Sequence, residues 1–259
     1  MLEWGNDDTP NNGRVALVTG AARGIGRAIA QAFVERGATV GICDLNPDDV
    51  AAACAALNAL GRGRAVPMTC DVSDYDALLA AIAATGLEFD TVINNAGISP
   101  KHDGVAHKVW QMAPEEWRRV VDVNLTGSFN TIRALTPSMI AARRGWIVNT
   151  SSVAGKTYSP IVACHYAATK SAIIGFTKHL AAELGPYAIR VNALAPGRIA
   201  TPMVAGVAPE VNAEQVKLTP MARLGEPAEV ADVALWLTST ESSFVTGQTI
   251  DVAGGLYMT

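Results

Sequence analysis

Three side chains that could carry out acid–base chemistry follow one another in the middle of the chain. Tyr166 and Lys170 are four residues apart, and Ser152 precedes them. Residues four apart on a helix share a face, so the phenol and the ammonium would be neighbours. A free phenol has a pKa of about 10, and a nearby cation favours its ionised form. The spacing therefore predicts a tyrosine with a lowered pKa, suited to act as general acid or base in exchanging a hydroxyl and a carbonyl.

A glycine-rich turn near the N-terminus predicts a phosphate-binding site. The sequence TGAARGIG at 19–26 directly follows an apolar, β-rich run and opens a helical pattern. Gly20, Gly24 and Gly26 allow a tight turn and a close approach to a pyrophosphate, whose charge is met by free N–H groups at the helix N-terminus.

The end of the next β-rich run indicates which dinucleotide would bind. Asp44 lies 18 residues after Gly26, where dinucleotide-binding folds place an acid against the adenosine ribose hydroxyls. A carboxylate there accepts hydrogen bonds from both hydroxyls and repels a 2′-phosphate. NAD is therefore the predicted cofactor rather than NADP, and Arg23, at the helix start, is expected to be mainly solvated.

The elements that must position these residues alternate along the chain. Strand-like runs that alternate with helical patterns predict βαβ units. They therefore predict a Rossmann-type, doubly wound α/β fold with a seven-stranded parallel sheet and helices on both faces. No linker or repeat interrupts the alternation, so residues 14–259 are predicted to form one domain after a polar, flexible arm at 1–13. The predicted strands are 15–19, 39–43, 64–69, 91–94, 146–150, 189–194 and 246–252.

Local signals predict where several helices begin and end. The first predicted helix stops at Gly37, and the second begins at Asn46 followed by Pro47, a capping residue and a first-turn proline. The third is predicted to begin with a capping box formed by Ser73 and Asp76.

The composition excludes several classes of protein. Among 259 residues, 49% are hydrophobic and 17% charged, which excludes a disordered chain. The formal net charge of −4, with both signs interspersed, provides no basic face for nucleic acid. No apolar run approaches a membrane span and no signal peptide is recognised, so a cytoplasmic protein is expected. The four cysteines and the histidines lack metal-site spacing, so reduced, structural cysteines and no metal are predicted.

Together the motifs resemble the compact branch of the short-chain dehydrogenase/reductase family, over about residues 14 to 257. The resemblance implies that Ser152, rather than Ser151, orients the substrate oxygen, that Tyr166 exchanges the proton, and that Lys170 lowers the pKa of Tyr166 and holds the nicotinamide ribose. It also implies that Asn124 holds a water in a proton relay. The matching stretches are TGAARGIG (19–26), Asp44, Asp71, NNAG (94–97), Asn124 in VNLTG, NTSS (149–152), YAATK (166–170) and RVNALAPG (190–197).

The resemblance extends the cofactor site along the chain. Asp71 has two interpretations, a carboxylate beside the adenine or the cap of the turn leading to Ser73. The amides of NNAG are expected to brace neighbouring strands. The full predicted cofactor set is Gly20, Arg23, Gly24, Ile25, Gly26, Asp44, Asp71, Val72, Asn94, Ala96, Gly97, Tyr166, Lys170, Pro196, Gly197, Ile199 and Thr201.

The resemblance also implies a substrate lid at about 200–224 and a homotetramer. The family's usual Asp-Gly-Gly near the end reads Ala253-Gly254-Gly255 here, in a stretch that usually lies near a subunit contact.

The function predicted from the sequence is NAD-dependent interconversion of a secondary alcohol, such as a polyol or sugar-derived hydroxyl, and its ketone. A 3-oxoacyl-thioester reductase acting on a carrier is the alternative, and a non-catalytic dinucleotide sensor is a third hypothesis. Several cationic or imidazole side chains could contact an anionic substrate or be solvated, and the sequence leaves both open. They are Lys101, His102, His107 and Arg198, whereas His165, beside Tyr166, is expected to serve in packing or a lid contact rather than in proton transfer.

Overall fold

A single parallel sheet forms the centre of the structure. The computed structural model describes residues 11–258, and its seven strands run in the order β3-β2-β1-β4-β5-β6-β7. All neighbouring strands pair in parallel, which confirms the predicted doubly wound α/β fold. The strands are β1 (Val15–Thr19), β2 (Thr39–Asp44), β3 (Arg64–Thr69), β4 (Thr91–Asn94), β5 (Gly145–Thr150), β6 (Ile189–Pro196) and β7 (Thr249–Val252).

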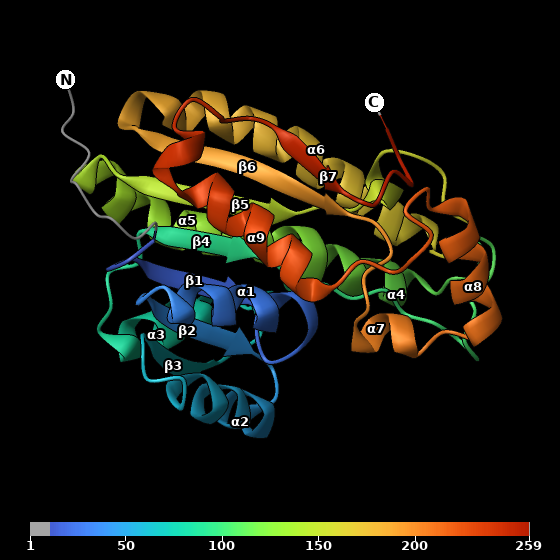
Figure 1. The fold of residues 1–259 in the computed structure, drawn as a ribbon, viewed down its shortest axis with the longest axis horizontal. Helices are drawn as coiled ribbons and strands as arrows, with labels where there is room; N and C mark the ends of the chain where they lie inside the picture. The colour runs from blue at the N-terminus through green and yellow to red at the C-terminus, as the bar shows by residue number, and fades with distance from the viewer. Residues whose placement is uncertain (1–10, 259) are drawn as a thin grey trace.

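Helices cover both faces of the sheet (Figure 1). Helices α1, α2 and α9 pack on one face around Phe33, Leu57 and Leu235. Helices α3, α5 and α6 pack on the other around Leu78, Met139 and Leu184. The helices are α1 (Gly24–Glu35), α2 (Pro47–Asn58), α3 (Tyr75–Thr85), α4 (Pro114–Val121), α5 (Gly127–Ala142), α6 (Cys164–Leu184), α7 (Pro202–Ala205), α8 (Pro209–Leu218) and α9 (Pro227–Thr238).

The strand order changes direction between β1 and β4. The chain winds from β1 outward to β3, then returns to the other side of β1 and winds outward through β4 to β7. In doubly wound sheets, the crevice outside the carboxyl ends at such a point binds ligands. Figure 1 shows the strand arrowheads pointing toward the end of the molecule where α7 and α8 lie.

The helix starts follow side-chain capping, with one correction. Asn46 caps α2 as predicted, because its Oδ1 accepts hydrogen bonds from the backbone N–H groups of Asp48 and Asp49. The predicted capping box at Ser73 is wrong: α3 begins after Asp74, whose carboxylate accepts from the Ala77 N–H. The Ser73 hydroxyl is already used, since it donates to Asp71.

Four strand ends also differ from prediction: β2 and β5 are each one residue longer, ending at Asp44 and beginning at Gly145, and β6 and β7 differ by more. Strand β7 begins at Thr249, not at 246, because Gly247 takes a left-handed conformation with φ of +73° that an extended strand cannot continue through. Strand β6 continues two residues further than predicted, to Pro196.

The predicted N-terminal arm is only partly within the described residues. Residues 1–10 lie outside them, but Asn11 does not behave as part of a flexible arm. It is buried, donates from Nδ2 to the Leu235 carbonyl at 3.3 Å, and accepts from the Thr238 hydroxyl at 3.1 Å. These bonds attach the chain to the end of α9 before β1 begins.

A π-helical turn, η1 (Asp122–Thr126), joins α4 to α5 without a break. Its flanking residues Val121 and Gly127 keep right-handed helical backbone angles. Such turns occur mostly as short insertions in α-helices and often lie at functional sites; here the turn contains Asn124. Among the described residues, no helix is long and apolar enough to span a membrane.

Candidate active site

The glycine-rich turn after β1 has the shape of a phosphate cradle. Gly20 and Gly24 have φ angles of +62° and +59°. A Cβ on Gly26 would lie 2.2 Å from the Gly20 carbonyl oxygen, and one on Gly20 would lie 2.9 Å from the Ala96 Cα. No side chain fits at these positions, so the turn stays open to a phosphate group at the N-terminus of α1.

The ends of β1 and β4 are fixed to each other across the crevice. The Thr19 hydroxyl accepts from the backbone N–H groups of Asn95 and Ala96, both at 3.0 Å. Asn95 donates from Nδ2 to the carbonyls of Thr19 and Gly20 at 3.1 Å. The amide that joins the glycine-rich turn to NNAG is thus that of Asn95, a residue absent from the predicted site.

Asn94 also braces neighbouring elements, on the other side of β4. Its Nδ2 donates to Asn149 Oδ1 at 2.9 Å, and its Oδ1 accepts from the buried Thr131 hydroxyl. These bonds connect β4, β5 and α5 beneath the sheet edge. Asn94 does not reach the cavity, so its predicted cofactor contact is not seen in this arrangement.

Two acids lie at the carboxyl ends of β2 and β3. The Asp44 carboxylate accepts from the backbone N–H groups of Ala22 at 3.0 Å and Leu45 at 2.8 Å, which fixes it beside the glycine-rich turn. Asp71 accepts from Ser73 and forms an ion pair with Arg119 at 2.9 Å. Burial works to raise the pKa of Asp71, but the bonds from Ser73 and Arg119 outweigh it and the pKa is lowered. Asp71 thus caps the turn leading to Ser73, and it also lines the cavity, while its place beside an adenine stays a prediction.

Cysteines that are distant in sequence meet beside these acids. Cys43 is the residue before the last one of β2, and Cys70 directly follows β3. Their sulfur atoms lie 3.3 Å apart. Both are free thiols, as are Cys54 and Cys164.

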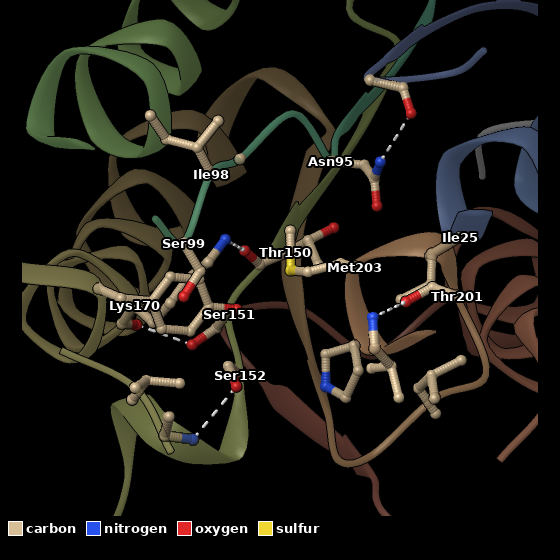
Figure 2. A pocket seen from close by; sticks show the side chains of 18 of the residues that line it. Ile25, Asn95, Ile98, Ser99, Thr150, Ser151, Ser152, Lys170, Thr201 and Met203 are labelled. Carbon is tan, nitrogen blue, oxygen red and sulfur yellow. Dashed lines mark hydrogen bonds between the residues drawn. The ribbon is translucent and has the colours of Figure 1, made fainter. Parts of the chain in front are cut away.

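A cavity of about 990 Å³ runs along the carboxyl edge of the sheet. Figure 2 shows Thr150, Ser151, Ser152 and Lys170 on one side of it, and Ile25 and Asn95 on another. Of the predicted site residues, Gly24, Gly26, Asn94 and Asn124 do not line it. Those that do are Gly20, Arg23, Ile25, Asp44, Asp71, Val72, Ala96, Gly97, Ser152, Tyr166, Lys170, Pro196, Gly197, Ile199 and Thr201.

Two buried hydroxyl groups face the cavity. The hydroxyls of Ser99 and Thr150 line it, are buried, and have no hydrogen-bond partner among the described residues. Buried polar groups are nearly always hydrogen-bonded. Together with the glycine cradle and Asp44, these hydroxyls fit an extended, polar cofactor in the crevice.

Ser152 and Tyr166 meet at the cavity wall. The Ser152 side chain accepts from the Ala154 N–H at 3.2 Å and is hydrogen-bonded to the Tyr166 hydroxyl. Burial raises the pKa of Tyr166, and the bond with Ser152 and the positive charge of Arg198 oppose this rise without cancelling it. The predicted lowering of this pKa is therefore wrong for the structure as described, where Tyr166 is a protonated phenol at neutral pH.

Lys170 is buried and bound to the backbone. Its Nζ donates to the Thr150 carbonyl at 2.7 Å and lies 5.6 Å from the centre of the Tyr166 ring. Burial lowers the pKa of Lys170 to about 8. The predicted proximity on one helix face is confirmed, but the cation whose charge opposes the rise of the Tyr166 pKa is Arg198.

Ser151 has a structural role that separates it from Ser152. Its buried hydroxyl donates to the Lys170 carbonyl at 2.7 Å, which attaches β5 to α6. Ser152 is therefore the serine next to Tyr166, as the resemblance implies.

Asn124 fixes the segment after NNAG. Its Oδ1 accepts from the Ile98 N–H at 2.8 Å, and its Nδ2 donates to the Ile98 carbonyl at 3.0 Å and to the Thr169 hydroxyl at 3.3 Å. These two hydrogen bonds to the backbone of Ile98 fix this part of the cavity wall. Its role in a proton relay stays a prediction.

Two cations that the sequence left undecided line the cavity. Arg198 donates from Nε and Nη2 to Asn212 Oδ1 at 3.0 and 2.5 Å, and Lys101 donates from Nζ to the Ile161 carbonyl. Burial is the main cause that lowers the pKa of each, and the charge of Arg198 further lowers that of Lys101. Their position at the cavity could be decided only from contacts in space, since neither belongs to a short motif.

The segment after β6 folds into two helices over the cavity. Thr201 caps α7, and Met203, Val207 and Leu218 from α7, α8 and their link line the cavity. These residues occupy the predicted lid. Gly197 is required at its base, because a Cβ there would lie 2.9 Å from the Ala253 Cβ.

Three of the four histidines, His102, His107 and His165, lie away from the cavity and close to one another. His165 is fully buried and bonds through Nε2 to Glu116 at 2.9 Å, so it packs between helices, as expected, and does not line the cavity. His102 and His107 also face Glu116. The expectation of no metal-type cluster, based on sequence spacing, thus differs from the arrangement in space.

Comparisons with known proteins agree with this geometry. The family model described as enoyl-(acyl carrier protein) reductase matches residues 20–257. The 3-oxoacyl-(acyl-carrier-protein) reductase FabG of Vibrio harveyi is 39% identical over 246 residues, 95% of this chain and 98% of that protein.

Solved structures are more similar still. A 3-oxoacyl-(acyl-carrier protein) reductase from Brucella melitensis is 86% identical with a TM-score of 0.96, covering 97% of this chain and 94% of that one. A second such structure from that organism, with bound NAD, is 83% identical with a TM-score of 0.94 and covers the same shares. The chain belongs to the short-chain dehydrogenase/reductase family, whose enzymes are oxidoreductases that bind a nicotinamide dinucleotide.

Proposed function

We propose that this chain reduces the 3-oxo group of an acyl thioester to a 3-hydroxyl with NADH. The observation that carries the proposed step is the contact between Ser152 and the buried Tyr166 at the cavity wall, where a protonated phenol can donate to a carbonyl oxygen. The similarity to proteins named 3-oxoacyl-(acyl-carrier-protein) reductase supports the substrate class, and favours this alternative over the polyol dehydrogenase expected from the sequence.

The side chains at the cavity wall suit such a reduction. Ser152 and Tyr166 both present hydroxyls to the point where a substrate carbonyl oxygen would lie. In the proposed step Tyr166 transfers its proton to that oxygen while Ser152 holds it by a hydrogen bond. NADH, when bound, supplies the hydride to the carbonyl carbon, so the ketone becomes a hydroxyl and NADH becomes NAD⁺.

The resulting Tyr166 phenolate must regain a proton. Arg198 stabilises the phenolate electrostatically, because its charge lowers the pKa of Tyr166. Lys170, with a pKa of about 8, can hold a proton near neutral pH at a short distance from the ring. We propose that these two cations divide the work that the sequence assigned to Lys170 alone.

The choice of NAD rests on Asp44. Its carboxylate is fixed by two backbone N–H groups beside the glycine-rich turn, where a 2′-phosphate would meet a negative charge. The similar Brucella structure with bound NAD is consistent with this. The predicted cofactor residues that line the cavity would hold the dinucleotide, with Gly24 and Gly26 shaping the turn beneath it.

An apolar wall gives space for an acyl chain. The loop after β4, the segment before α6, the lid and the chain after β7 contribute apolar side chains to the cavity. They are Ile98, Pro100, Ile161, Val162, Met203, Val204, Val207, Leu218 and Leu256.

Lys101 and Arg198 favour a second candidate function, the oxidation of a secondary alcohol that carries a carboxylate. Two half-buried cations facing one cavity would attract an anion near Tyr166. A small hydroxy acid satisfies both cations, whereas a neutral polyol satisfies neither.

The experiment compares both candidates on one preparation. Acetoacetyl thioester with NADH or NADPH, and a panel of 2- and 3-hydroxy acids and polyols with NAD, are assayed by the absorbance of reduced cofactor, with Tyr166→Phe as inactive control. The proposal expects thioester reduction with NADH to give the highest kcat/KM. Hydroxy-acid oxidation at a higher value would favour the second candidate, and activity retained in Tyr166→Phe would refute the role of Tyr166.

We propose three further properties of this protein. Residues 14–259 act as one domain that holds both cofactor and substrate, the chain assembles as a homotetramer, and it acts in the cytoplasm. Sedimentation velocity showing a stable monomer would contradict the second.

A further inference from the structure

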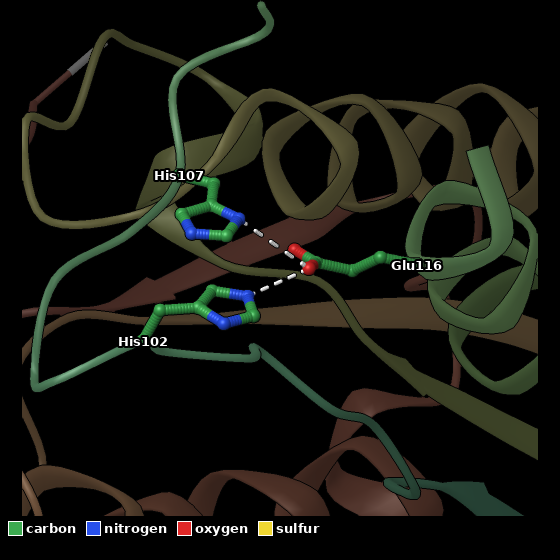
Figure 3. A group of neighbouring side chains, drawn as sticks. All are labelled: His102, His107 and Glu116. Carbon is green, nitrogen blue, oxygen red and sulfur yellow. Dashed lines mark hydrogen bonds and ion pairs between the residues drawn. The ribbon is translucent and has the colours of Figure 1, made fainter. Parts of the chain in front are cut away.

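Two histidines and a glutamate form a cluster outside the cavity (Figure 3). His102 and His107 come from the loop after β4, and Glu116 from the first turn of α4. His102 Nε2 lies 2.7 Å and His107 Nδ1 3.8 Å from the same carboxylate oxygen, Glu116 Oε2. None of the three lines the cavity, so the cluster is separate from the reaction site.

The local backbone fixes both imidazoles. His102 begins a tight turn closed by two backbone hydrogen bonds with Val105, and Asp103 and Gly104 at its centre have φ angles of +50° and +79°. These are the backbone angles of the compact turns that join antiparallel strands. The turn places the His107 ring parallel to that of His102, with ring centres 3.4 Å apart and 3° between the planes. Figure 3 shows a nitrogen of each ring facing the carboxylate.

The donor atoms are of the type and spacing that a transition metal ion requires. Their three ligand atoms lie within 4.8 Å of one another. In a tetrahedral zinc site with bonds of about 2.1 Å, ligand atoms are about 3.4 Å apart. The distances of 2.7 and 3.8 Å to Glu116 lie on either side of that value. Because the two rings are parallel and 3.4 Å apart, they must also tilt toward each other before one ion can lie in both ring planes and bind both imidazoles and the carboxylate.

A buried partner orients the glutamate from behind. His165, fully buried on α6, bonds through Nε2 to Glu116 Oε1 at 2.9 Å and leaves Oε2 to the other two histidines. Second partners of this kind hold metal-binding groups in position. Hydrogen bonds from His165 and His102 outweigh burial and lower the pKa of Glu116, so it is a carboxylate at neutral pH.

One atom in the cluster lacks a partner. His107 Nδ1 is buried and makes no hydrogen bond with any residue of 11–258, although it faces Glu116. A buried nitrogen of this kind is costly unless something binds it. Because it points to the same place as His102 Nε2 and Glu116 Oε2, a single ion would complete all three.

We propose that His102, His107 and Glu116 bind one divalent transition metal ion of the zinc class. The side chains of His102 and His107 are 42% and 30% exposed, which leaves a remaining coordination position to water. The ion would attach the loop after β4 to α4 and, through His165, to α6. Lys101, next to His102, lines the cavity, so the ion would fix one rim of the substrate site.

The test is direct metal binding by the full chain, without a histidine tag and after treatment with a chelator. Zn²⁺ is titrated by calorimetry and Co²⁺ by its visible absorption. We expect one ion per chain. His107→Ala and Glu116→Gln should each weaken metal binding at least about tenfold. Even the loss of a residue that only hydrogen-bonds to a metal ligand weakens metal affinity by about this much.

Matched controls address other zinc ligands. His179, 82% exposed beside Glu183 on α6, is removed by His179→Ala, and the exposed thiol next to His165 by Cys164→Ser. Both should bind as the wild type, and circular dichroism checks that His107→Ala is folded. Binding that is absent in the wild type, retained in His107→Ala, or lost in either control would overturn the proposal. Activity plays no part in the readout, so the outcome is independent of the proposed reaction.

Discussion

The burial of Lys170 leads to a stability prediction whose sign depends on pH. Its pKa falls from 10.5 to about 8 because the folded protein disfavours the charged ammonium. At about 1.4 kcal/mol per pKa unit, the charged form costs about 3 kcal/mol of folding free energy. Replacing Lys170 with methionine, of similar length and no charge, removes this cost. It also removes the bond to the Thr150 carbonyl, which contributes about 1 kcal/mol.

At pH 7 the Lys170→Met variant should therefore be more stable than the wild type by about 2 kcal/mol, while losing its activity. Between pH 8 and 10.5, unfolded Lys170 keeps a proton that the folded protein has released, so wild-type stability rises with pH relative to the variant. The advantage should shrink through this range and reverse near its upper end, where only the lost hydrogen bond remains.

Urea unfolding followed by tryptophan fluorescence, on protein freed of nicotinamide dinucleotide and at one concentration, measures the effect. With a slope of about 3 kcal/mol per molar, the midpoint at pH 7 should rise by about 0.7 M. Lys178→Met, on the exposed face of the same helix, controls for helix propensity and should change little. A stabilisation that stays constant from pH 7 to pH 10, or that Lys178→Met reproduces, would refute the reasoning.

Three further variants test the site. Gly26→Ala places a Cβ 2.2 Å from the Gly20 carbonyl oxygen and should weaken dinucleotide binding at least about tenfold, equivalent to about 1.4 kcal/mol, by fluorescence titration; near-normal affinity would contradict the cradle. Asp44→Ala should lower kcat/KM for NADH and raise it for NADPH, and an unchanged ratio would argue against Asp44 as the selector. Arg198→Leu removes the cation that lowers the Tyr166 pKa, so the limb of the pH–rate profile that reports Tyr166 should move to higher pH; a fixed limb would exclude the coupling.

Short-range patterns predicted the parts of the site that lie within one element. The turn at 19–26 follows from glycine spacing, because positive φ angles and close backbone contacts are local. The pair Tyr166 and Lys170 follows from the helical repeat. Ser152 follows from its place directly after a strand, since parallel strands bring their carboxyl ends together.

Properties that depend on contacts between distant segments could not be predicted in the same way. Arg198 meets Tyr166 and Asn212 only after the lid folds. The direction of the Tyr166 pKa depends on burial, which spacing does not report. Likewise Ser73 loses the cap of α3 because its hydroxyl is taken by Asp71, a competition between neighbours that a four-residue pattern does not resolve.

The π-helical turn η1 makes the helix from α4 to α5 sensitive to length. It separates α5 from the part of α4 that carries Glu116, which is hydrogen-bonded to His165. It also contains Asn124, which is hydrogen-bonded to the backbone of Ile98. Removing one residue from the turn could restore a regular α-helix, but each residue of an α-helix turns the chain by about 100°. With α5 anchored on the sheet, α4 would rotate by that angle and Glu116 would leave His165. A single-codon deletion here is thus expected to be more harmful than a substitution at the same place, although the helix itself would become more regular.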